Sequence, residues 1–355
     1  MKRPLIALLI LLLATIAVPR IFNPQNETDQ NQTSTPLTLS GRTMGTSYHV
    51  TVVPSGNGVL KRDELQQLID TRLQEINQRM STYINDSELS RINKAKAQKW
   101  INISAETAEV INAAQQISIE TDGAFDITLG NLVNLWGFGP DINLYAVPDA
   151  DRIETTLALC GYHKLEIQMD PPRIKKHNDS LYLDLSGIAK GYGVDQIAEL
   201  LEHLGYQNHL VEIGGEIRTG GKKRPGTPWN IGIERPQAEG RSVQKIIHTS
   251  NTTAMATSGD YRNYFEHQGR RYSHTIDPAT GYPITHKLAA VSVLHESCML
   301  ADAYATAFMV MGPQQAMDFA KQHEIAIYML VKGEQGFVPL SSPAFEKFIS
   351  SVRLK

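Results

Sequence analysis

Cysteine is scarce in this sequence: only Cys160 and Cys298 occur among its 355 residues. No CxxC pair and no Cys/His zinc spacing is present, which excludes a structural zinc site of the usual kind. Two cysteines this far apart do not form a disulfide framework, even in an oxidising compartment. We therefore expect two buried free thiols, with a single disulfide as the alternative.

An excess of charge of one sign is also lacking. The 34 Lys and Arg residues nearly balance the 37 Asp and Glu residues, and the formal net charge is -3. This balance gives no broad electrostatic reason to expect a nucleic-acid partner, and the short basic stretch "GKKRPG" at 221–226 is typical of a solvated hairpin loop. The length of 355 residues favours one large domain or two smaller ones, and the hydrophobic content of 41% is ordinary for a folded protein.

Long hydrophobic runs are lacking apart from Leu5–Val18, which follows a basic start. The run is close to the shortest that spans a bilayer, and small residues near Ala17 would permit cleavage, so we expect a secretory signal peptide or an uncleaved anchor over 1–22. No cysteine follows for lipid attachment. The polar, proline-flanked stretch 23–36 predicts a flexible linker. The folded domain is then expected over 37–350, outside the cytoplasm.

Strand and helix patterns are mixed along this folded part. Apolar periodicity predicts helices over 65–80, from an N-cap at Ser104 to Asp122, over 194–204 with a stop at Gly205, and over 301–311. Alternating or continuous apolar runs predict strands at 47–54, 181–185, 208–215, 229–236, 289–294 and 325–331. No internal repeat and no simple βαβ array is present, so the fold class is α+β.

A cluster of small residues separates the strand at 181–185 from the following helix, in "LYLDLSGIAKGYGVDQI". Backbone N–H groups and the helix dipole at such a position can hold a phosphate. The spacing fits neither the Walker loop, nor the dinucleotide GxGxxG motif, nor the SxxK nucleophile. Two interpretations remain. One is a phosphate-binding turn, which Lys190 favours because a buried cation needs an anionic partner; the other is a tight packing turn.

Asp302 and Thr306 lie four residues apart on the strongly apolar segment "ADAYATAFMVMG", so a helix would place them on one face. A carboxylate and a hydroxyl suit a hard cation such as Mg²⁺, which also binds substrate phosphate. The alternative is that Asp302 only caps the helix or forms a local hydrogen bond.

Three further segments carry weaker signals. His274 falls in a predicted strand, "RYSHTI", and is either structural or catalytic. The glycine- and aromatic-rich stretch 123–139 is either an ordered loop lining a pocket or a segment of the core. The paired glycines of "VEIGGEIR" indicate that the backbone comes close to a ligand or to another strand.

Eight segments of the sequence also resemble the motifs of a known family. The segments "MGTSYHV", "STY…DSELSRIN", "GAFDITLGNLVNLWGFG", "DLSGIAKGYGVD", "VEIGGEIR", "TSGDYRNYF", "SHTIDPATGYPI" and "ADAYATAFMVMG" resemble, in order, the motifs of the ApbE family of FAD:protein FMN transferases. The resemblance covers about Met44 to about Gly312. It implies an α+β, ApbE-like two-lobed body of mixed sheets and helices, with FAD bound between the lobes.

The resemblance also implies an activity. Such an enzyme splits the FAD pyrophosphate with Mg²⁺, attaches FMN through a phosphoester to a Thr or Ser of a target protein, and releases AMP. The implied partners are flavin-accepting subunits of membrane redox complexes, of the Na⁺-translocating NADH:quinone reductase or Rnf type, at the periplasmic side of the bacterial inner membrane. Two rival functions remain: a FAD pyrophosphatase that yields FMN and AMP, and a non-catalytic periplasmic flavin-binding protein.

Site residues follow from the same resemblance. It implies catalytic roles for His274, Asp302 and Lys190, and metal ligation by the Gly187 carbonyl, Asp302 and Thr306. The implied cofactor-binding residues are Met44, Tyr83, Ala124, Phe125, Asp126, Asp184, Lys190 and Ile276. The sequence departs from several relatives at Ala305, where they have an aspartate, and this difference implies one carboxylate fewer near the metal.

Overall fold

The structure is a computed structural model. It describes residues 35–54, 60–140, 146–223, 226–236, 242–249, 251–261 and 263–353. The predicted signal peptide or anchor at 1–22 and almost all of the predicted linker lie outside these residues. In the part of the chain that is described, no helix is long and apolar enough to cross a membrane.

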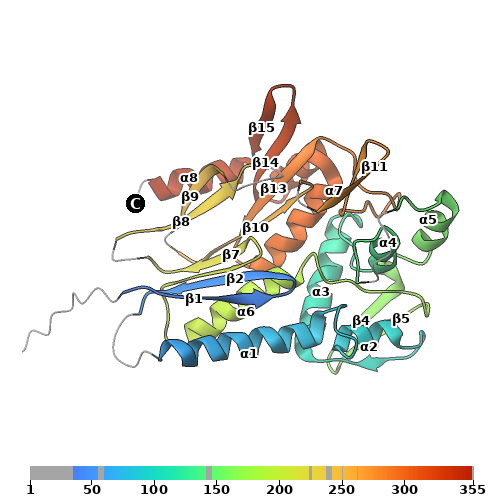
Figure 1. The fold of residues 1–355 in the computed structure, drawn as a ribbon, viewed down its shortest axis with the longest axis horizontal. Helices are drawn as coiled ribbons and strands as arrows, with labels where there is room; N and C mark the ends of the chain where they lie inside the picture. Colours follow the sequence, from blue (N-terminus) through green and yellow to red (C-terminus); the bar gives the residue numbers. More distant parts are fainter. Residues whose placement is uncertain are drawn as a thin grey trace, which may run out of the picture. The chain divides into compact units, whose positions relative to one another are not determined.

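One long sheet organises the fold (Figure 1). Its strand order is β1-β2-β6-β7-β10-β13-β14-β15, and every neighbouring pair is antiparallel. The strands are β1 (Leu37–Thr43), β2 (Thr46–Val52), β6 (His209–Ile213), β7 (Glu216–Gly220), β10 (Thr253–Gly259), β13 (Leu288–His295), β14 (Ala326–Gly333) and β15 (Gly336–Ser341). The expected α+β mixture without a βαβ array is confirmed.

Helices and small sheets complete the described body. Contacts with the long sheet are made by α1 (Arg62–Met80), α6 (Ala189–His203), α7 (Cys298–Gln322) and α8 (Pro343–Arg353). The other elements are α2 (Glu88–Lys94), α3 (Ala105–Glu120), α4 (Gly130–Leu135), α5 (Ala150–Leu157), the sheet β3 (Ile101–Asn102), β5 (Pro172–Lys176) and β4 (Leu165–Met169), and the hairpins β8 (Trp229–Glu234) with β9 (Val243–Thr249) and β11 (Tyr264–His267) with β12 (Arg270–Ser273).

Local signals in the sequence predicted two helix ends correctly, the start of α3 and the end of α6, whereas α7 extends beyond the predicted 301–311 at both ends. The Ser104 side chain accepts a hydrogen bond from the Thr107 amide at 3.2 Å and caps α3. Gly205 follows α6 with a φ of 87°, the left-handed conformation that ends a helix at little cost for glycine. The predicted free thiols are also confirmed, because Cys160 and Cys298 are both buried and unpaired.

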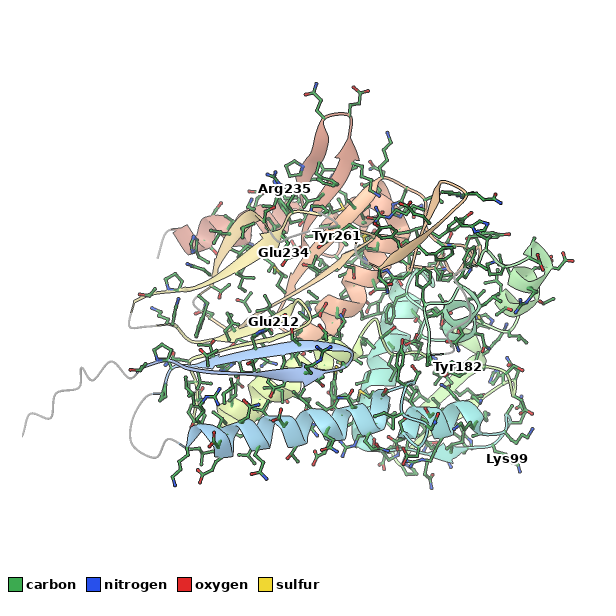
Figure 2. All side chains as sticks on the ribbon, viewed as in Figure 1. Lys99, Tyr182, Glu212, Glu234, Arg235 and Tyr261 are labelled. Atoms are coloured by element: carbon green, nitrogen blue, oxygen red, sulfur yellow. The ribbon has the colours of Figure 1, made fainter. Side chains whose placement is uncertain are left out.

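The segment 181–185 is not the predicted strand. It is extended but joins a neighbour only through a bridge at Tyr182, which Figure 2 labels. The Asn93 side chain takes the place of a partner strand, since it accepts from the Leu183 amide at 2.7 Å and donates to the Leu183 carbonyl at 2.9 Å. The Asp184 amide donates to the Ile127 carbonyl. The alternation of apolar and polar residues therefore predicted correctly which of these side chains are buried. It did not predict which groups form hydrogen bonds with their backbone.

Helices α6 and α7 are joined at their N-terminal ends by reciprocal hydrogen bonds. The Gly191 amide on α6 donates to Asp302 Oδ2 on α7 at 3.0 Å. In return, Asp195 on α6 accepts from the amides of Cys298 and Met299 at the start of α7, at 3.0 and 2.9 Å. The glycine-rich turn and the helix that carries Asp302 are thus in direct contact, as the predicted metal site requires.

We expect Gly191→Ala to lower the free energy of unfolding by about 3 kcal/mol, because the new methyl group would overlap backbone. A Cβ built on Gly191 lies 2.2 Å from the Cys298 carbonyl oxygen, and main chain cannot move aside as a side chain can. Gly193→Ala is the matched control on the same helix, since its closest neighbour at 3.0 Å is the flexible end of Met44. Urea unfolding of both variants measures the difference, and equal losses would contradict the expectation.

Candidate active site

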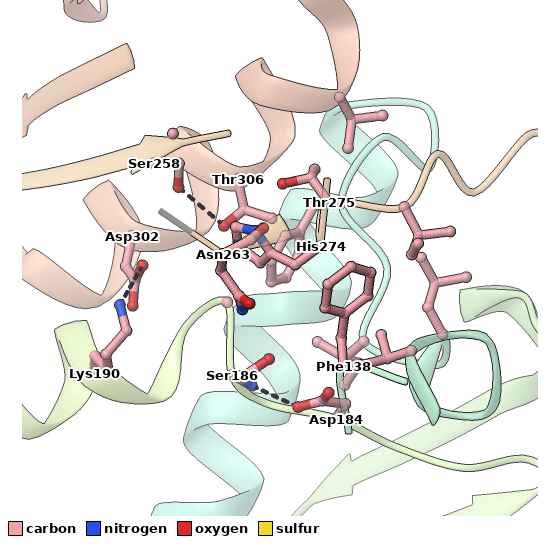
Figure 3. A pocket seen from close by; sticks show the side chains of 18 of the residues that line it. Phe138, Asp184, Ser186, Lys190, Ser258, Asn263, His274, Thr275, Asp302 and Thr306 are labelled. Carbon is pink, nitrogen blue, oxygen red and sulfur yellow. Dashed lines mark hydrogen bonds and ion pairs between the residues drawn. The ribbon is translucent and has the colours of Figure 1, made fainter. Parts of the chain in front are cut away.

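A cavity of about 420 Å³ lies where α6, α7, β7 and β10 meet the loop before α4 (Figure 3). Its walls come from distant parts of the sequence. The lining residues are Tyr83, Ala124–Ile127, Leu129, Val133, Phe138, Asp184, Ser186, Gly187, Lys190, Gly214, Glu216, Thr257–Gly259, Tyr261, Asn263, His274–Ile276, Asp302, Thr306 and Val310. Every site residue named in the sequence analysis is among them except Met44.

Met44 lies in the turn between β1 and β2, with a φ of 48°. Its side chain packs toward α6, where its sulfur is 3.7 Å from a Cβ built on Gly193. The structure therefore does not place Met44 in the cavity wall, and its contact with a cofactor stays a prediction. Tyr83 is the opposite case: it is 69% exposed and available at the rim of the cavity.

The stretch 123–139 combines both of its predicted roles. The residues from Ala124 to Ile127 and Phe138 line the cavity, whereas Trp136 is fully buried and stacks on Tyr272 in a separate apolar cluster. Asp126 is held in place by amide donors, from Thr128 at 2.7 Å and from Tyr162 at 2.8 Å. Burial raises the pKa of Asp126, and these hydrogen bonds oppose that shift.

Asp184 also lines the cavity, where its amide donates to the carbonyl of the neighbouring Ile127 and its carboxylate accepts a hydrogen bond from the Ser186 amide at 2.8 Å. Burial raises the pKa of this carboxyl group, while the bond to Ser186 acts against the shift. The Asx-type turn that results fixes the backbone just before Gly187. Asp184 thus lines the cavity at the end of the extended segment, and its contact with FAD stays a prediction.

Lys190 lies between two carboxylates in the cavity wall. Its Nζ is 2.7 Å from Glu216 Oε1 and 3.8 Å from Asp302 Oδ1. Burial by itself would lower the pKa of Lys190, but the charges of Asp302 and Glu216 outweigh it and raise the pKa above the ordinary value. The lysine therefore stays protonated and supplies a fixed positive charge at the cavity wall.

Glu216 was missed at the sequence level. It is the first residue of β7, follows the paired glycines of "VEIGGEIR", and keeps only 3% of its side chain exposed. Burial raises the pKa of Glu216 to about 7, with Lys190 opposing and Asp302 reinforcing that shift. An acidic residue directly after two turn glycines was the available signal, but nothing local indicated that it would pair with Lys190.

The predicted metal ligands Gly187, Asp302 and Thr306 come together at the cavity. A Cβ built on Gly187 would lie 3.2 Å from Thr306 Oγ1, a tight contact, so glycine lets the backbone approach the hydroxyl without displacing it. Ser258 Oγ, which the sequence analysis did not single out, is 3.4 Å from the same hydroxyl. A carboxylate, hydroxyls and a main-chain carbonyl are hard oxygen donors and fit Mg²⁺.

The protein offers few acidic ligands for this cation. Within the described ranges, no group of three or more His, Cys, Asp or Glu side chains is arranged to hold a metal. Ala305 is fully buried in the apolar cluster formed with β13 and does not line the cavity. A cation at this position would therefore depend on oxygen atoms of a bound substrate as well as on Asp302.

His274 lies just past the end of β12, in a bend rather than within the predicted strand. Its Nδ1 is 3.0 Å from the carbonyl oxygen of Asn263. Because a carbonyl can only accept, Nδ1 carries the proton of the neutral ring and Nε2 keeps a free lone pair. Burial lowers the pKa of His274 below its usual value, which favours this neutral form. The ring also contacts Phe138 edge-on, with centroids 6.3 Å apart.

Comparisons with known proteins point to one family. The model of the ApbE family matches residues 44–329. The chain is 46% identical over 312 residues to the FAD:protein FMN transferase of Vibrio cholerae serotype O1, a match that covers 88% of this chain and 92% of that protein. Identity to the FAD:protein FMN transferase of Haemophilus influenzae is 42%, over 88% of this chain and 91% of that protein.

Solved structures give the same result. The flavin transferase ApbE from Vibrio cholerae has a TM-score of 0.82 and 43% identity, over 89% of this chain and 99% of that one. The flavinyl transferase ApbE from Pseudomonas stutzeri, in its apo form, has a TM-score of 0.81 and 40% identity, over 89% of this chain and 98% of that one.

Proposed function

The chain belongs to the ApbE family, and from that membership we propose that it is an FAD:protein FMN transferase. The observation that carries the proposal is the convergence of Lys190, Asp302, Thr306 and His274 on one cavity. A cation holder, a fixed positive charge and a neutral histidine are what phosphoryl transfer from a pyrophosphate needs, since this chemistry depends on positioning and charge neutralisation.

The proposed reaction joins FMN to a hydroxyl group of the acceptor protein. The Thr or Ser oxygen attacks the phosphorus on the FMN side of FAD, the bond from that phosphorus to the bridging oxygen breaks, and AMP leaves. His274 Nε2 accepts the proton of the attacking hydroxyl, for which its free lone pair is suited. A carboxylate near the cavity is the alternative acceptor of this proton.

The residues of the cavity wall have separate tasks in this proposal. Lys190 places its ammonium group against the diphosphate, and Asp184 and Phe125 shape the walls that receive the two halves of FAD. Asp302, Thr306 and the Gly187 carbonyl would hold Mg²⁺. When bound, this ion would neutralise charge on the diphosphate oxygens.

We also propose where the enzyme acts and on what. The basic start and apolar run of the leader support export, so the catalytic domain would work on the periplasmic side of the inner membrane. The acceptors would be flavin-carrying subunits of membrane redox complexes of the Na⁺-translocating NADH:quinone reductase or Rnf type. Family membership supports a protein acceptor, and the choice between these complexes rests on the family resemblance.

Mass spectrometry tests the proposal directly. The purified chain without its first 22 residues is mixed with FAD, MgCl₂ and a candidate acceptor domain, and the acceptor should gain the mass of FMN less one water. A parallel reaction without acceptor serves as the control. Rapid release of FMN and AMP in the control would favour the pyrophosphatase instead, and tight FAD binding without any AMP would favour a flavin-binding protein.

A further inference from the structure

The carboxylate of Glu216 is the closest charged partner of Lys190 in the cavity wall. Gly214 and Gly215, with φ values of 63° and 111°, form the turn that brings the start of β7 beneath the lysine. Glu216 Oε1 is 2.7 Å from Lys190 Nζ. Its other oxygen, Oε2, is buried and has no hydrogen-bond partner among the described residues. Lys190 is therefore the main compensation for this buried negative charge.

The charges around Lys190 do not favour a free anion. Asp302 is the second carboxylate near the ammonium group, as the dashed line in Figure 3 shows. When both carboxylates are ionised, the three groups together carry one net negative charge. Asp126 and Asp184 line the same cavity, and Lys190 is the only Lys or Arg in its described lining. The diphosphate of FAD carries about two negative charges, and like charges at this distance repel when they are shielded from water.

We propose that Glu216 is a positioning residue that holds Lys190 at the cavity wall and offsets its charge, so that FAD binds well only together with a divalent cation. This inference rests on the proposed use of FAD. It assigns Glu216 two separable effects: the ion pair fixes the lysine, and its charge makes binding depend on the metal. The carboxylate touches Lys190 rather than the reacting atoms, so it acts through the lysine and through the local field.

The test measures FAD binding by fluorescence titration in EDTA and in MgCl₂, at pH 8, which is above the pKa of about 7 of Glu216. Removing one negative charge from the wall with Glu216→Gln should lower the Kd for FAD in EDTA by about tenfold. The Kd in MgCl₂ should change much less, so the ratio of the two Kd values shrinks. Lys190→Met should do the reverse and raise the Kd in both buffers. AMP release is followed in parallel, so that the Kd is measured before FAD is cleaved.

Glu212→Gln is the matched control. Glu212, which Figure 2 labels, lies on the neighbouring strand β6, pairs with His49 at 2.7 Å and does not line the cavity, so its replacement removes the same charge at another place. Its Oε1 also accepts from the Gly215 amide at 2.7 Å, and the amide oxygen of glutamine can keep this bond and with it the turn before Glu216. It should leave both Kd values as in the unmodified protein. An unchanged Kd ratio in Glu216→Gln, or an equal change in Glu212→Gln, would overturn the inference.

A second variant separates the two effects and guards against misfolding. Glu216→Asp keeps the charge but withdraws it from Lys190, so the dependence on Mg²⁺ should persist while kcat for transfer falls about tenfold through loss of positioning. Thermal melting confirms that each variant is folded. If Glu216→Gln does not fold, an Asp variant with unchanged kcat refutes the positioning role. Because the titration needs no acceptor, a shifted Kd ratio without any FMN transfer would contradict the proposed function and leave the inference standing.

Discussion

Asp302→Asn should lower the rate of FMN transfer by about 10²–10³-fold, even in saturating MgCl₂. Asp302 is the only carboxylate among the predicted metal ligands, and its Oδ1 also faces Lys190 at 3.8 Å. Its loss would remove both the charge that holds the cation and part of the field around the diphosphate. Transfer to a purified acceptor domain, followed by mass spectrometry over a range of Mg²⁺ concentrations, measures the effect.

The asparagine is chosen because Asp302 also has a structural role. Its Oδ2 accepts from the Gly191 amide at 3.0 Å, and an alanine would leave this buried amide without its partner. Asparagine retains an acceptor oxygen of similar size, so the variant should remain folded. Wild-type transfer by Asp302→Asn at high Mg²⁺ would refute its assignment as the metal-holding residue.

Asp195→Asn gives the contrast that distinguishes chemistry from packing. Asp195 also joins α6 to α7, and it pairs with Arg218 at 2.9 Å, but it lies outside the lining of the cavity. Breaking a buried ion pair on one side is expected to lower the free energy of unfolding by about 3 kcal/mol. Transfer per folded molecule should stay near the wild-type rate. A large loss of transfer in this variant would mean that Asp302→Asn also acts through packing.

The start of α3 and the end of α6 could be predicted because their causes are local. The hydroxyl of Ser104 reaches an amide three residues ahead, and Gly205 adopts the left-handed conformation that ends α6. Nothing outside these short segments is needed for either effect. Apolar spacing likewise found the buried face of α1, whose residues at 65, 69, 73, 76 and 80 are all buried.

Features that depend on distant partners could not be predicted in the same way. The segment 181–185 has the alternation of a strand, but its hydrogen bonds go to the Asn93 side chain, ninety positions away in the sequence. Glu216 meets Lys190 only because β6 and β7 lie next to each other and α6 packs against them. The residues that line the site were mostly identified, since their motifs resemble a family, whereas the electrostatic partner of the central lysine required the structure.

The prediction that His274 lies within a strand was wrong, because the end of the strand could not be located from the sequence. Strand β12 ends at Ser273, and the amide and Nδ1 of His274 both face the Asn263 carbonyl, which lies in the turn before β11. The backbone bond to Asn263 continues the register in which Tyr264 pairs with Ser273, but the regular strand has already ended at His274. The apolar alternation of the sequence did not indicate where this strand ends.

His274→Gln should lower kcat for FMN transfer by about 10²–10⁴-fold, because glutamine can neither accept the hydroxyl proton nor move it away. The unmodified enzyme should also show a characteristic dependence on pH. A histidine acts as a base in its neutral form, and burial lowers the pKa of His274 below 6.5. Activity should therefore persist at pH 6.5 and decline only as the pH falls through the lowered pKa of His274.

The pH profile is what separates a proton acceptor from a residue that merely packs against Phe138. In His274→Gln the residual rate should lose the acidic decline, since the group that titrates is gone, while FAD binding changes little. His248→Gln is the control, because His248 is exposed and bonds to Asn230 far from the cavity lining; it should keep both the rate and the profile. If His274→Gln retained the acidic decline of the unmodified enzyme, the proton acceptor would have to be a carboxylate, and the raised pKa of Asp184 would make that residue the next to replace.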